Sequence, residues 1–100
     1  MPDDGMNLSV IIPVYNSEKT LVYLNQRLVS VLTKLTKEYE IIYVNDGSID
    51  QSENKILKFI KKNKKKFFNA KIKLISYTKN VGKGYAIKKG ILISKSKWIL

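Results

Sequence analysis

The stretch VIIPVYNSEKT, residues 10–20, contains the change from strand to helix that decides the fold. The apolar run at residues 8–14 is typical of a strand buried on both faces of a parallel sheet. Asn16 or Ser17 can cap a helix, and leucine and valine side chains then recur at helical spacing over residues 18–37. The stretch therefore predicts a strand, a short turn and an amphipathic helix.

The rest of the chain repeats this unit. The run YEIIYVN predicts a second apolar strand, Asp46-Gly47 supplies a turn, and Asp50 with Glu53 resembles a capping box that opens a second helix. Because strands alternate with helices, the pattern predicts a parallel sheet with right-handed crossovers in a three-layer α/β architecture. The predicted strands span residues 8–14, 39–45 and 71–77 and begin again near 97, with a helix after each of the first three.

Composition limits the kinds of protein that this chain can be. Its 100 residues allow one domain, and a content of 44% hydrophobic and 27% charged residues is typical of a globular protein. The lack of cysteine excludes disulfides and thiolate metal sites, and the lack of histidine leaves carboxylates, lysines and tyrosines for any chemistry. The acidic start, and the lack of an apolar run of about 18 to 20 residues, predict a cytoplasmic protein.

The formal net charge of +11 suggests a nucleic-acid or anionic-membrane partner, since basic patches bind phosphates. However, Arg27 is the only arginine among the 19 basic residues, and arginine is the residue suited to bidentate recognition of bases. Blocks of like charge usually lie in solvent, and the lysine-rich run at residues 61–66 fits that description. The charge pattern therefore favours a solvated lysine face over specific nucleic-acid recognition.

Polar motifs follow three of the predicted strands: PVYN at residues 13–16, NDGS at 45–48 and TKNVGK at 78–83. In open parallel sheets the ligand crevice lies beyond the carboxyl ends of the strands, so these motifs are expected to share one edge. Pro13 ends the sheet ladder and stiffens the turn that presents Tyr15, whose ring can stack on a planar base. Each motif alone also fits an ordinary turn, so the functional prediction rests on their common location.

The motifs VIIPVYN, EIIYVNDGSID and KNVGKGYAIKKGI, in that order and at these spacings, resemble the nucleotide-binding half of family 2 glycosyltransferases with the GT-A fold. The form NVGKGYA is similar to the branch that makes dolichyl- or polyprenyl-phosphate sugars. The resemblance implies a Rossmann-like, mainly parallel sheet. It also implies that residues 1–7 are a disordered tail and that residues 8–100 are the N-terminal nucleotide-binding part of a glycosyltransferase domain.

Seven residues match family positions that bind a nucleotide-sugar donor, and the resemblance favours UDP over GDP. They are Pro13, Val14, Tyr15, Glu18, Asp46, Gly82 and Lys83. The first three would form the base pocket, Glu18 would approach the ribose or a neighbouring loop, and Asp46 would accept a hydrogen bond from the base N–H. Gly82 and Lys83 would approach the phosphates of the donor, where the lysine acts as a point charge.

Two features of the family are absent from these residues. An Asp-x-Asp motif would follow the strand that begins near residue 97, and in the complete enzyme it would hold a Mg²⁺ or Mn²⁺ ion on the donor diphosphate. A general base would lie further downstream. We therefore expect a truncated, catalytically silent chain without catalytic residues or metal ligands. Many relatives have Asp where this chain has Asn45, so that position receives no charge-dependent role.

The expected acceptor is a polyprenyl phosphate or a glycan. The lysine-rich run at residues 61–66 could hold such an enzyme at the cytoplasmic face of an anionic membrane, and the unpaired edge of the last strand invites association. An alternative is a small basic α/β module that binds nucleic acid or an anionic membrane through this lysine face. The two hypotheses differ in where binding lies. A glycosyltransferase fragment would bind its ligand at the strand-end edge, and Asp46→Asn would weaken that binding. The basic module would bind over the lysine run, with a steep salt dependence.

Overall fold

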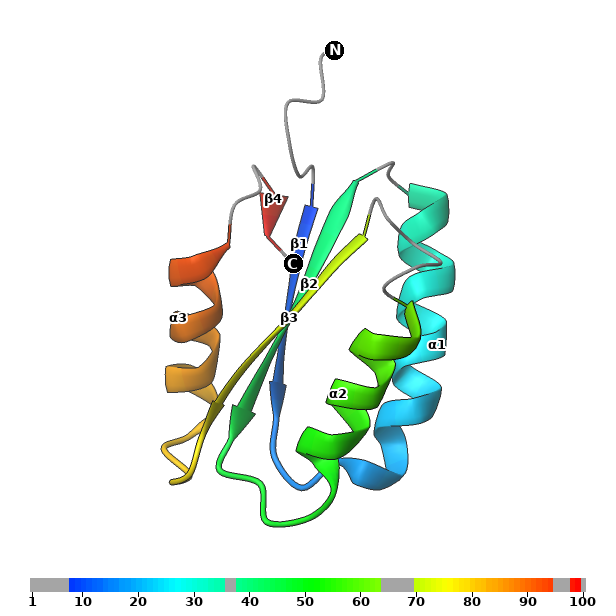
Figure 1. Ribbon diagram of the computed structural model, residues 1–100. Coiled ribbons are helices and arrows are strands. Elements are labelled where there is room, and N and C mark those ends of the chain that lie inside the picture. Colours follow the sequence, from blue (N-terminus) through cyan, green and yellow to red (C-terminus); the bar gives the residue numbers. More distant parts are fainter. Residues whose placement is uncertain (1–7, 36–37, 64–69, 95–97, 100) are drawn as a thin grey trace.

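The computed structural model describes residues 8–35, 38–63, 70–94 and 98–99. Within these ranges strands and helices alternate along the chain, as predicted (Figure 1). The elements are β1 (Leu8–Val14), α1 (Glu18–Leu35), β2 (Tyr39–Asp46), α2 (Ser52–Asn63), β3 (Ala70–Tyr77), α3 (Lys83–Ile93) and β4 (Trp98–Ile99). The predicted disorder of residues 1–7 and the second half of the lysine-rich run lie outside the described residues.

The four strands form one parallel sheet in the order β3-β2-β1-β4. β1 pairs with β2 from Leu8 opposite Tyr39 to Val14 opposite Asn45, and with β4 at its amino end. The first two crossovers move one way across the sheet, and the third returns past β1 to β4. Right-handed crossovers therefore place α1 and α2 on one face and α3 on the other, giving the predicted three layers (Figure 1). This reversal makes the carboxyl end of β1 a topological switch point, where such sheets bind ligands.

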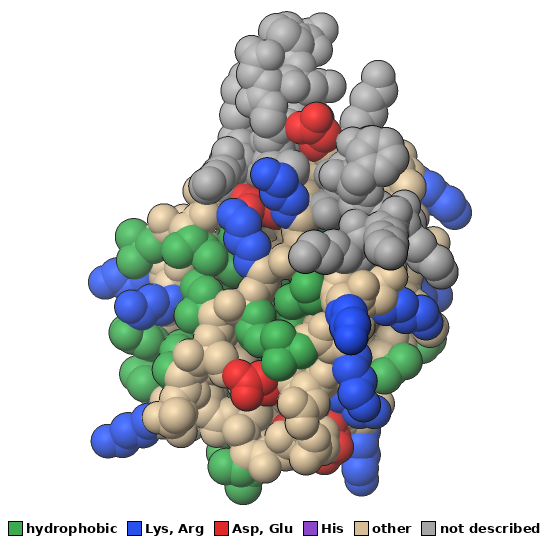
Figure 2. All heavy atoms as spheres, in the orientation of Figure 1, with side chains coloured by type: hydrophobic (Ala, Val, Ile, Leu, Met, Phe, Trp, Pro, Cys, Tyr) green, Lys and Arg blue, Asp and Glu red, His purple; other side chains and the backbone are tan. Residues whose placement is uncertain are grey.

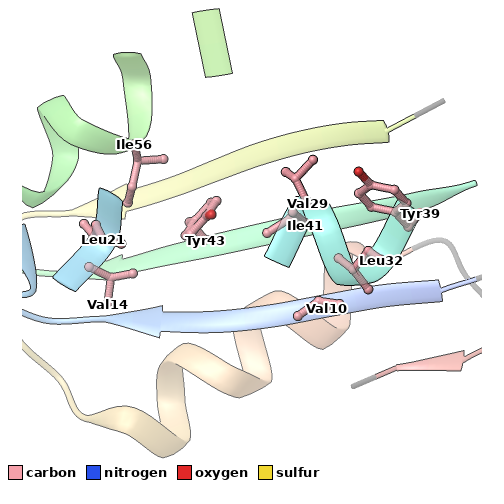
Figure 3. Packing of buried hydrophobic residues seen from close by; sticks show 9 residues of the cluster. All are labelled: Val10, Val14, Leu21, Val29, Leu32, Tyr39, Ile41, Tyr43 and Ile56. Carbon is pink, nitrogen blue, oxygen red and sulfur yellow. The ribbon is translucent and has the colours of Figure 1, made fainter. Parts of the chain in front are cut away.

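The larger core lies between the sheet and the helices α1 and α2 (Figure 3). Leu21 on α1 and Ile56 on α2 are fully buried against the sheet. At the centre, the ring of Tyr43 lies edge-on to that of Phe59 with 6.4 Å between centroids, and its hydroxyl donates a hydrogen bond to Asn25 Oδ1. Burial raises the pKa of Tyr43. Every residue of β2 is buried, which explains why its central residues, 41–44, form a continuous apolar run.

Among the described elements, α3 alone covers the opposite face of the sheet. Gly90 lies so close to β1 that an added Cβ would stand 2.4 Å from Cγ2 of Ile11. Ala86, one turn earlier, is fully buried and packs with Ile42 and Val44. These two small residues let the helix approach the strands closely, and this approach fixes where α3 begins relative to the edge of the sheet.

A buried charge lies near the amino ends of the strands on this same face. Glu40 is fully buried, accepts a hydrogen bond from the Ser9 hydroxyl and pairs with Lys73 Nζ at 2.9 Å. A buried carboxylate needs such partners because an unpaired charge is costly to desolvate. The cluster lies at the opposite end of the sheet from the polar motifs, so its role is in the fold and not in the candidate site.

Candidate functional site

The three polar motifs meet at the carboxyl edge of the sheet, the lower edge in Figure 1. The loops after β1 and β2 are joined there: the N–H of Asn16 donates to Ser48 Oγ at 2.9 Å, and the N–H of Ile49 donates to Asn16 Oδ1 at 3.0 Å. Asn16 has a φ of 47°, a left-handed conformation that asparagine tolerates better than most residues. These bonds fix the turn that carries Tyr15.

The amino ends of α1 and α2 share one capping carboxylate, that of Asp50. Its Oδ2 accepts a hydrogen bond from the N–H of Glu18 at 3.2 Å, and its Oδ1 accepts one from the N–H of Ser52 at 2.9 Å. Burial alone would raise the pKa of Asp50, but hydrogen bonds from Ser52 and Glu18 lower it below its ordinary value of 3.8. Asp50 is therefore a helix cap, as the sequence indicates, and it serves two helices at once.

The start of α1 differs from the prediction in one respect. Ser17 takes the N-cap position, and its carbonyl oxygen accepts a hydrogen bond from the N–H of Leu21 at 3.1 Å. Its hydroxyl, however, donates to the carbonyl oxygen of Tyr15 at 3.1 Å. The side-chain bond to the first turn comes instead from Asp50, 32 residues away from Glu18 in sequence. A capping partner that lies on another loop cannot be recognised from local sequence.

On the other side of this edge, the side chain of Asp46 binds the loop between β3 and α3. Its Oδ1 accepts a hydrogen bond from the N–H of Val81 at 2.7 Å, and its Oδ2 accepts from the N–H of Gly82 at 2.8 Å and from Asn80 Nδ2 at 2.9 Å. Asp46 is only 3% exposed. Burial alone would raise its pKa, but the N–H groups of Val81 and Gly82 lower it below the ordinary 3.8. The carboxylate is therefore ionised at neutral pH and fixes this loop. We call this arrangement the Asp46 clamp.

Two glycines permit the close contact between these loops. Gly47 has a φ of 68°, and an added Cβ would stand 2.4 Å from the backbone nitrogen of Asn80, so a side chain does not fit there. Gly82 has a φ of 123° and precedes α3. The N–H of Ala86 donates a hydrogen bond to the carbonyl oxygen of Gly82 at 3.1 Å, which closes the first turn of α3. No side chain among the described residues caps this helix. The positive end of the α3 dipole therefore points to the edge.

A small aromatic cluster adjoins the Asp46 clamp. The rings of Tyr77 and Tyr85 lie edge-to-face with 5.6 Å between centroids, and Lys89 Nζ stands 5.4 Å from the centroid of Tyr85. Burial, and then the neighbouring Asp46 carboxylate, raise the pKa of Tyr77 to about 12. Its buried hydroxyl forms no hydrogen bond of regular geometry with a described residue.

The seven predicted site residues all lie at this edge, but they differ in exposure. The ring of Tyr15 is 52% exposed, and Lys83 is also exposed, so both side chains can reach a ligand. Val14 and Asp46 are buried. The partly buried members are Pro13, Glu18 and Gly82. The set thus contains two exposed side chains suited to direct contact and others that shape the loops around them.

Sequence reasoning missed the asparagines that hold the loops together. Asn80 donates from Nδ2 to the carboxylate of Asp46 and also to its carbonyl oxygen at 3.0 Å. Asn45 accepts a hydrogen bond from the N–H of Ser48 at 3.3 Å and donates to Ser76 Oγ at 3.0 Å, so it uses both ends of its amide. The sequence signal is that both asparagines lie within the polar motifs, but Asp46, the partner of Asn80, and Ser76, a partner of Asn45, lie on other strands.

The residues that the structure describes form neither a metal site nor a membrane-spanning helix. In these ranges, no group of three or more histidine, cysteine, aspartate or glutamate side chains could hold a metal ion. Asp46 is already bound to N–H donors, so the residues present do not fit the Mg²⁺ or Mn²⁺ ion that the resemblance implies, and that ion stays a prediction for the complete enzyme. Across the same ranges, no helix is both long and apolar enough to cross a lipid bilayer.

Solved structures define the class of fold. The chain is similar to the crystal structure of S. aureus TarS 1–349, with a TM-score of 0.69 and 28% sequence identity over 95% of this chain and 26% of the TarS chain. The crystal structure of TarS 1–349 in complex with UDP matches with a TM-score of 0.65 and 25% identity, over the same shares of the two chains. The predicted GT-A fold is confirmed.

Sequence comparison then gives the family. The model of glycosyl transferase family 2 matches residues 9–100, and the chain belongs to this family. Human dolichyl-phosphate beta-glucosyltransferase is 39% identical over 98 residues, which cover 93% of this chain and 29% of that protein. An undecaprenyl-phosphate 4-deoxy-4-formamido-L-arabinose transferase of Pectobacterium atrosepticum is 50% identical over 52 residues, 52% of this chain and 16% of that protein.

These relatives bear on two of the predictions. The resemblance to the branch that makes dolichyl- and polyprenyl-phosphate sugars is confirmed. Family membership also favours the enzyme interpretation over the small basic module. The chain spans less than a third of the length of these curated relatives, so the activity of a whole enzyme is a matter for the proposal that follows.

Proposed function

We propose that the carboxyl edge of the sheet binds the nucleoside diphosphate of a nucleotide-sugar donor, UDP in preference to GDP, for transfer of the sugar to a polyprenyl phosphate or a glycan. The observation that carries this proposal is the Asp46 clamp, which holds Gly82, Lys83 and the amino end of α3 at the edge that Tyr15 also occupies. Family membership and the UDP complex of the similar protein TarS support it.

The loop after β1 would form the base side of the site. The half-exposed ring of Tyr15 offers a flat face on which a uracil ring can stack. Pro13 and Val14, at the end of β1, would lie beneath the base, and the Asn16 bonds to the next loop keep this turn rigid. Glu18, in the first turn of α1, would accept hydrogen bonds from the ribose hydroxyls, a role suited to a partly buried carboxylate.

Asp46 would serve both halves of the site. An ionised carboxylate offers about four positions for accepting hydrogen bonds. Val81, Gly82 and Asn80 donate three bonds to these oxygens. These three bonds keep the loop after β3 in place, and the family resemblance implies that the carboxylate also accepts a hydrogen bond from the base N–H. A single carboxylate would thus tie base recognition to phosphate binding.

The loop after β3 would form the phosphate side. Lys83 is exposed at the first residue of α3, and the amino end of an α-helix carries a partial charge of about +0.5. Gly82 has no side chain to obstruct the approach of a phosphate to these N–H groups. A lysine charge and a helix dipole that act on the same diphosphate predict binding that weakens as salt is added.

In this proposal the metal-binding motif and the general base belong to the complete enzyme. We assign no catalytic residue within the described ranges, and this chain by itself is expected to bind the donor without transferring its sugar. A location at the cytoplasmic face of an anionic membrane, where lipid-phosphate acceptors reside, belongs to the same proposal. Transfer of sugar to a polyprenyl phosphate by this chain alone would contradict the division between binding and chemistry.

Calorimetric titration with UDP, GDP and CMP tests the donor assignment. We expect UDP to bind most tightly, and Tyr15→Ala to weaken UDP binding about tenfold through the loss of base stacking. Lys83→Ala should also weaken binding and should flatten its salt dependence. Lys71→Ala removes an exposed lysine at the opposite end of the sheet and should leave binding unchanged. Equal binding by all four proteins, or no binding of any nucleotide, would contradict the proposal.

A further inference from the structure

A concave surface lies between α1 and α2, on the face of the sheet opposite α3. It is a groove of about 670 Å³. Its lining residues are Val22, Asn25, Gln26, Val29, Ser30, Thr33, Lys34, Lys55, Lys58, Phe59 and Lys62. None of the seven donor-site residues is among them, so the groove is separate from the strand-end edge. We call it the α1/α2 groove.

The α1/α2 groove combines apolar side chains with a positively charged rim. Val29 and Phe59 are largely withdrawn from solvent, while Val22 is about half exposed. Lys55, Lys58 and Lys62 follow one another at helical spacing along α2, and Lys34 lies on α1. None of the described residues that line the groove is acidic. Figure 2 shows basic side chains gathered over α2, which makes this a strongly positive surface.

We propose that the α1/α2 groove binds an amphipathic helix of another protein, with apolar side chains on one face and aspartate or glutamate beside them. Two packed helices leave a furrow into which a third helix can place apolar anchors at every third or fourth residue. Acidic residues beside those anchors would meet the lysine rim from both helices, and such complementarity gives specificity and fast association.

Two other occupants fit the groove less well. A second copy of this chain carries a formal charge of +11 and only eight acidic residues, so two copies repel each other. A flat anionic membrane can meet the lysines, but it leaves the furrow between the helices unfilled, whereas helix side chains can enter it. The proposal is independent of donor binding, because the groove and the strand-end edge share no residue.

A labelled synthetic peptide provides the test. The probe is a helix with leucine on one face and glutamate on the flanks, and its control keeps the leucines but carries lysine in place of glutamate. We expect the acidic helix to bind, by fluorescence anisotropy, and the basic helix not to bind. In amide NMR spectra the acidic helix should shift signals of α1 and α2 along the groove and leave the signals near Tyr15 and Lys83 unchanged.

Two variants separate shape from charge. Lys55→Glu with Lys58→Glu reverses the rim and should weaken peptide binding about tenfold or more, while Lys71→Glu with Lys88→Glu, which changes net charge equally at exposed sites elsewhere, should have little effect. Ser30→Trp fills the groove without a change of charge and should also weaken binding about tenfold. Amide spectra of each variant establish that it is folded.

Three results would overturn the proposal. One is the absence of binding by the acidic helix. Another is equal loss of peptide binding in the two charge-reversed proteins with no effect of Ser30→Trp, which would show attraction by net charge alone. The third is tight adsorption to phosphatidylglycerol vesicles, sensitive to Lys55→Glu with Lys58→Glu and insensitive to Ser30→Trp, with no binding of the peptide. That result would assign the surface to a membrane. Failure of UDP binding in the same preparations would not affect any of these readings.

Discussion

Asp46 and Asp50 lie at the two ends of one short loop, and each binds a different part of the chain. Asp46 binds the N–H groups of Val81 and Gly82 beyond β3, whereas Asp50 binds those of Glu18 and Ser52 at the starts of two helices. In both carboxyl groups, hydrogen bonds from neighbouring donors outweigh burial and lower the pKa. The same chemistry therefore holds both sides of the candidate site.

The difference between the two lies in what each aspartate holds. Asp50 caps helices that are also anchored by core residues such as Leu21 and Ile56, so their positions do not depend on the cap alone. The loop of Asn80 and Gly82 lies outside any helix or strand, and its hydrogen bonds to Asp46 are what fix it. We therefore expect Asp46 to be critical for ligand binding and Asp50 to matter mainly for local stability.

The largest effect is expected at Gly47, which follows Asp46 and packs against the backbone of Asn80. Gly47→Ala places a Cβ in a left-handed conformation and against the backbone of Asn80, so it should lower the free energy of unfolding by more than about 2 kcal/mol. It should also displace the phosphate loop and abolish UDP binding. Gly84→Ala is the matched control, since a Cβ at Gly84 meets nothing within 4 Å. Urea denaturation of both variants measures the difference, and equal stabilities would contradict the close contact.

A smaller effect is expected from loss of the Asp46 clamp. Asp46→Asn keeps one oxygen but turns an NH₂ group toward an N–H donor, so the loop loses at least one bond. We expect UDP affinity to fall about tenfold or more, because the phosphate loop and the base contact both depend on this carboxylate. Calorimetric titration measures the change.

Asp50→Asn tests whether the two aspartates differ in role. It turns an NH₂ group toward one of the two N–H donors of the shared helix cap and should cost about 1 kcal/mol of stability through the lost hydrogen bond. UDP affinity should change by less than about twofold, because the helices remain anchored by their cores. If Asp50→Asn abolished UDP binding while Asp46→Asn left it intact, the assignment of roles to the two aspartates would be wrong.

The smallest effect concerns pH. Because the pKa of each aspartate is lower in the folded chain, the unfolded chain binds more protons, and stability rises with pH. This contribution is fully present above the ordinary value of 3.8 and is lost as the pH falls through that value toward the folded pKa. Urea denaturation between about pH 3 and pH 7 should show this loss, with a shallower profile for Asp46→Asn. An equally steep profile for the variant would exclude a contribution from Asp46.

Much of the fold could be predicted from the sequence because local signals carry it. The apolar runs of β1 and β2 predict strands buried on both faces, and the observed strands match their predicted limits to within a residue. Ala86 and Gly90, spaced one turn apart, lie on the side of α3 that approaches the sheet. The order of the strands, in which β4 returns to pair with β1, could not be predicted, because alternation and the handedness of crossovers also allow other orders.

The details of the site could not be predicted because they depend on contacts distant in sequence. Asp46 and Gly82 are 36 residues apart, and Asp50 and Glu18 are 32 apart, so neither pairing leaves a local pattern. The motifs identify the residues that gather at the edge, but not which of them bind each other. The α1/α2 groove was missed for a similar reason, since its two walls come from separate helices.

The most direct test of the central claim is an amide NMR titration of the isotope-labelled chain with UDP. We expect signals from residues 15–18 and residues 81–84 to shift together at one affinity, and signals along the α1/α2 groove to stay in place. In Asp46→Asn both sets of shifts should require about tenfold more UDP, or more. Shifts that follow the lysines of α2, or a spectrum that UDP leaves unchanged, would contradict the assignment of the donor site to the carboxyl edge of the sheet.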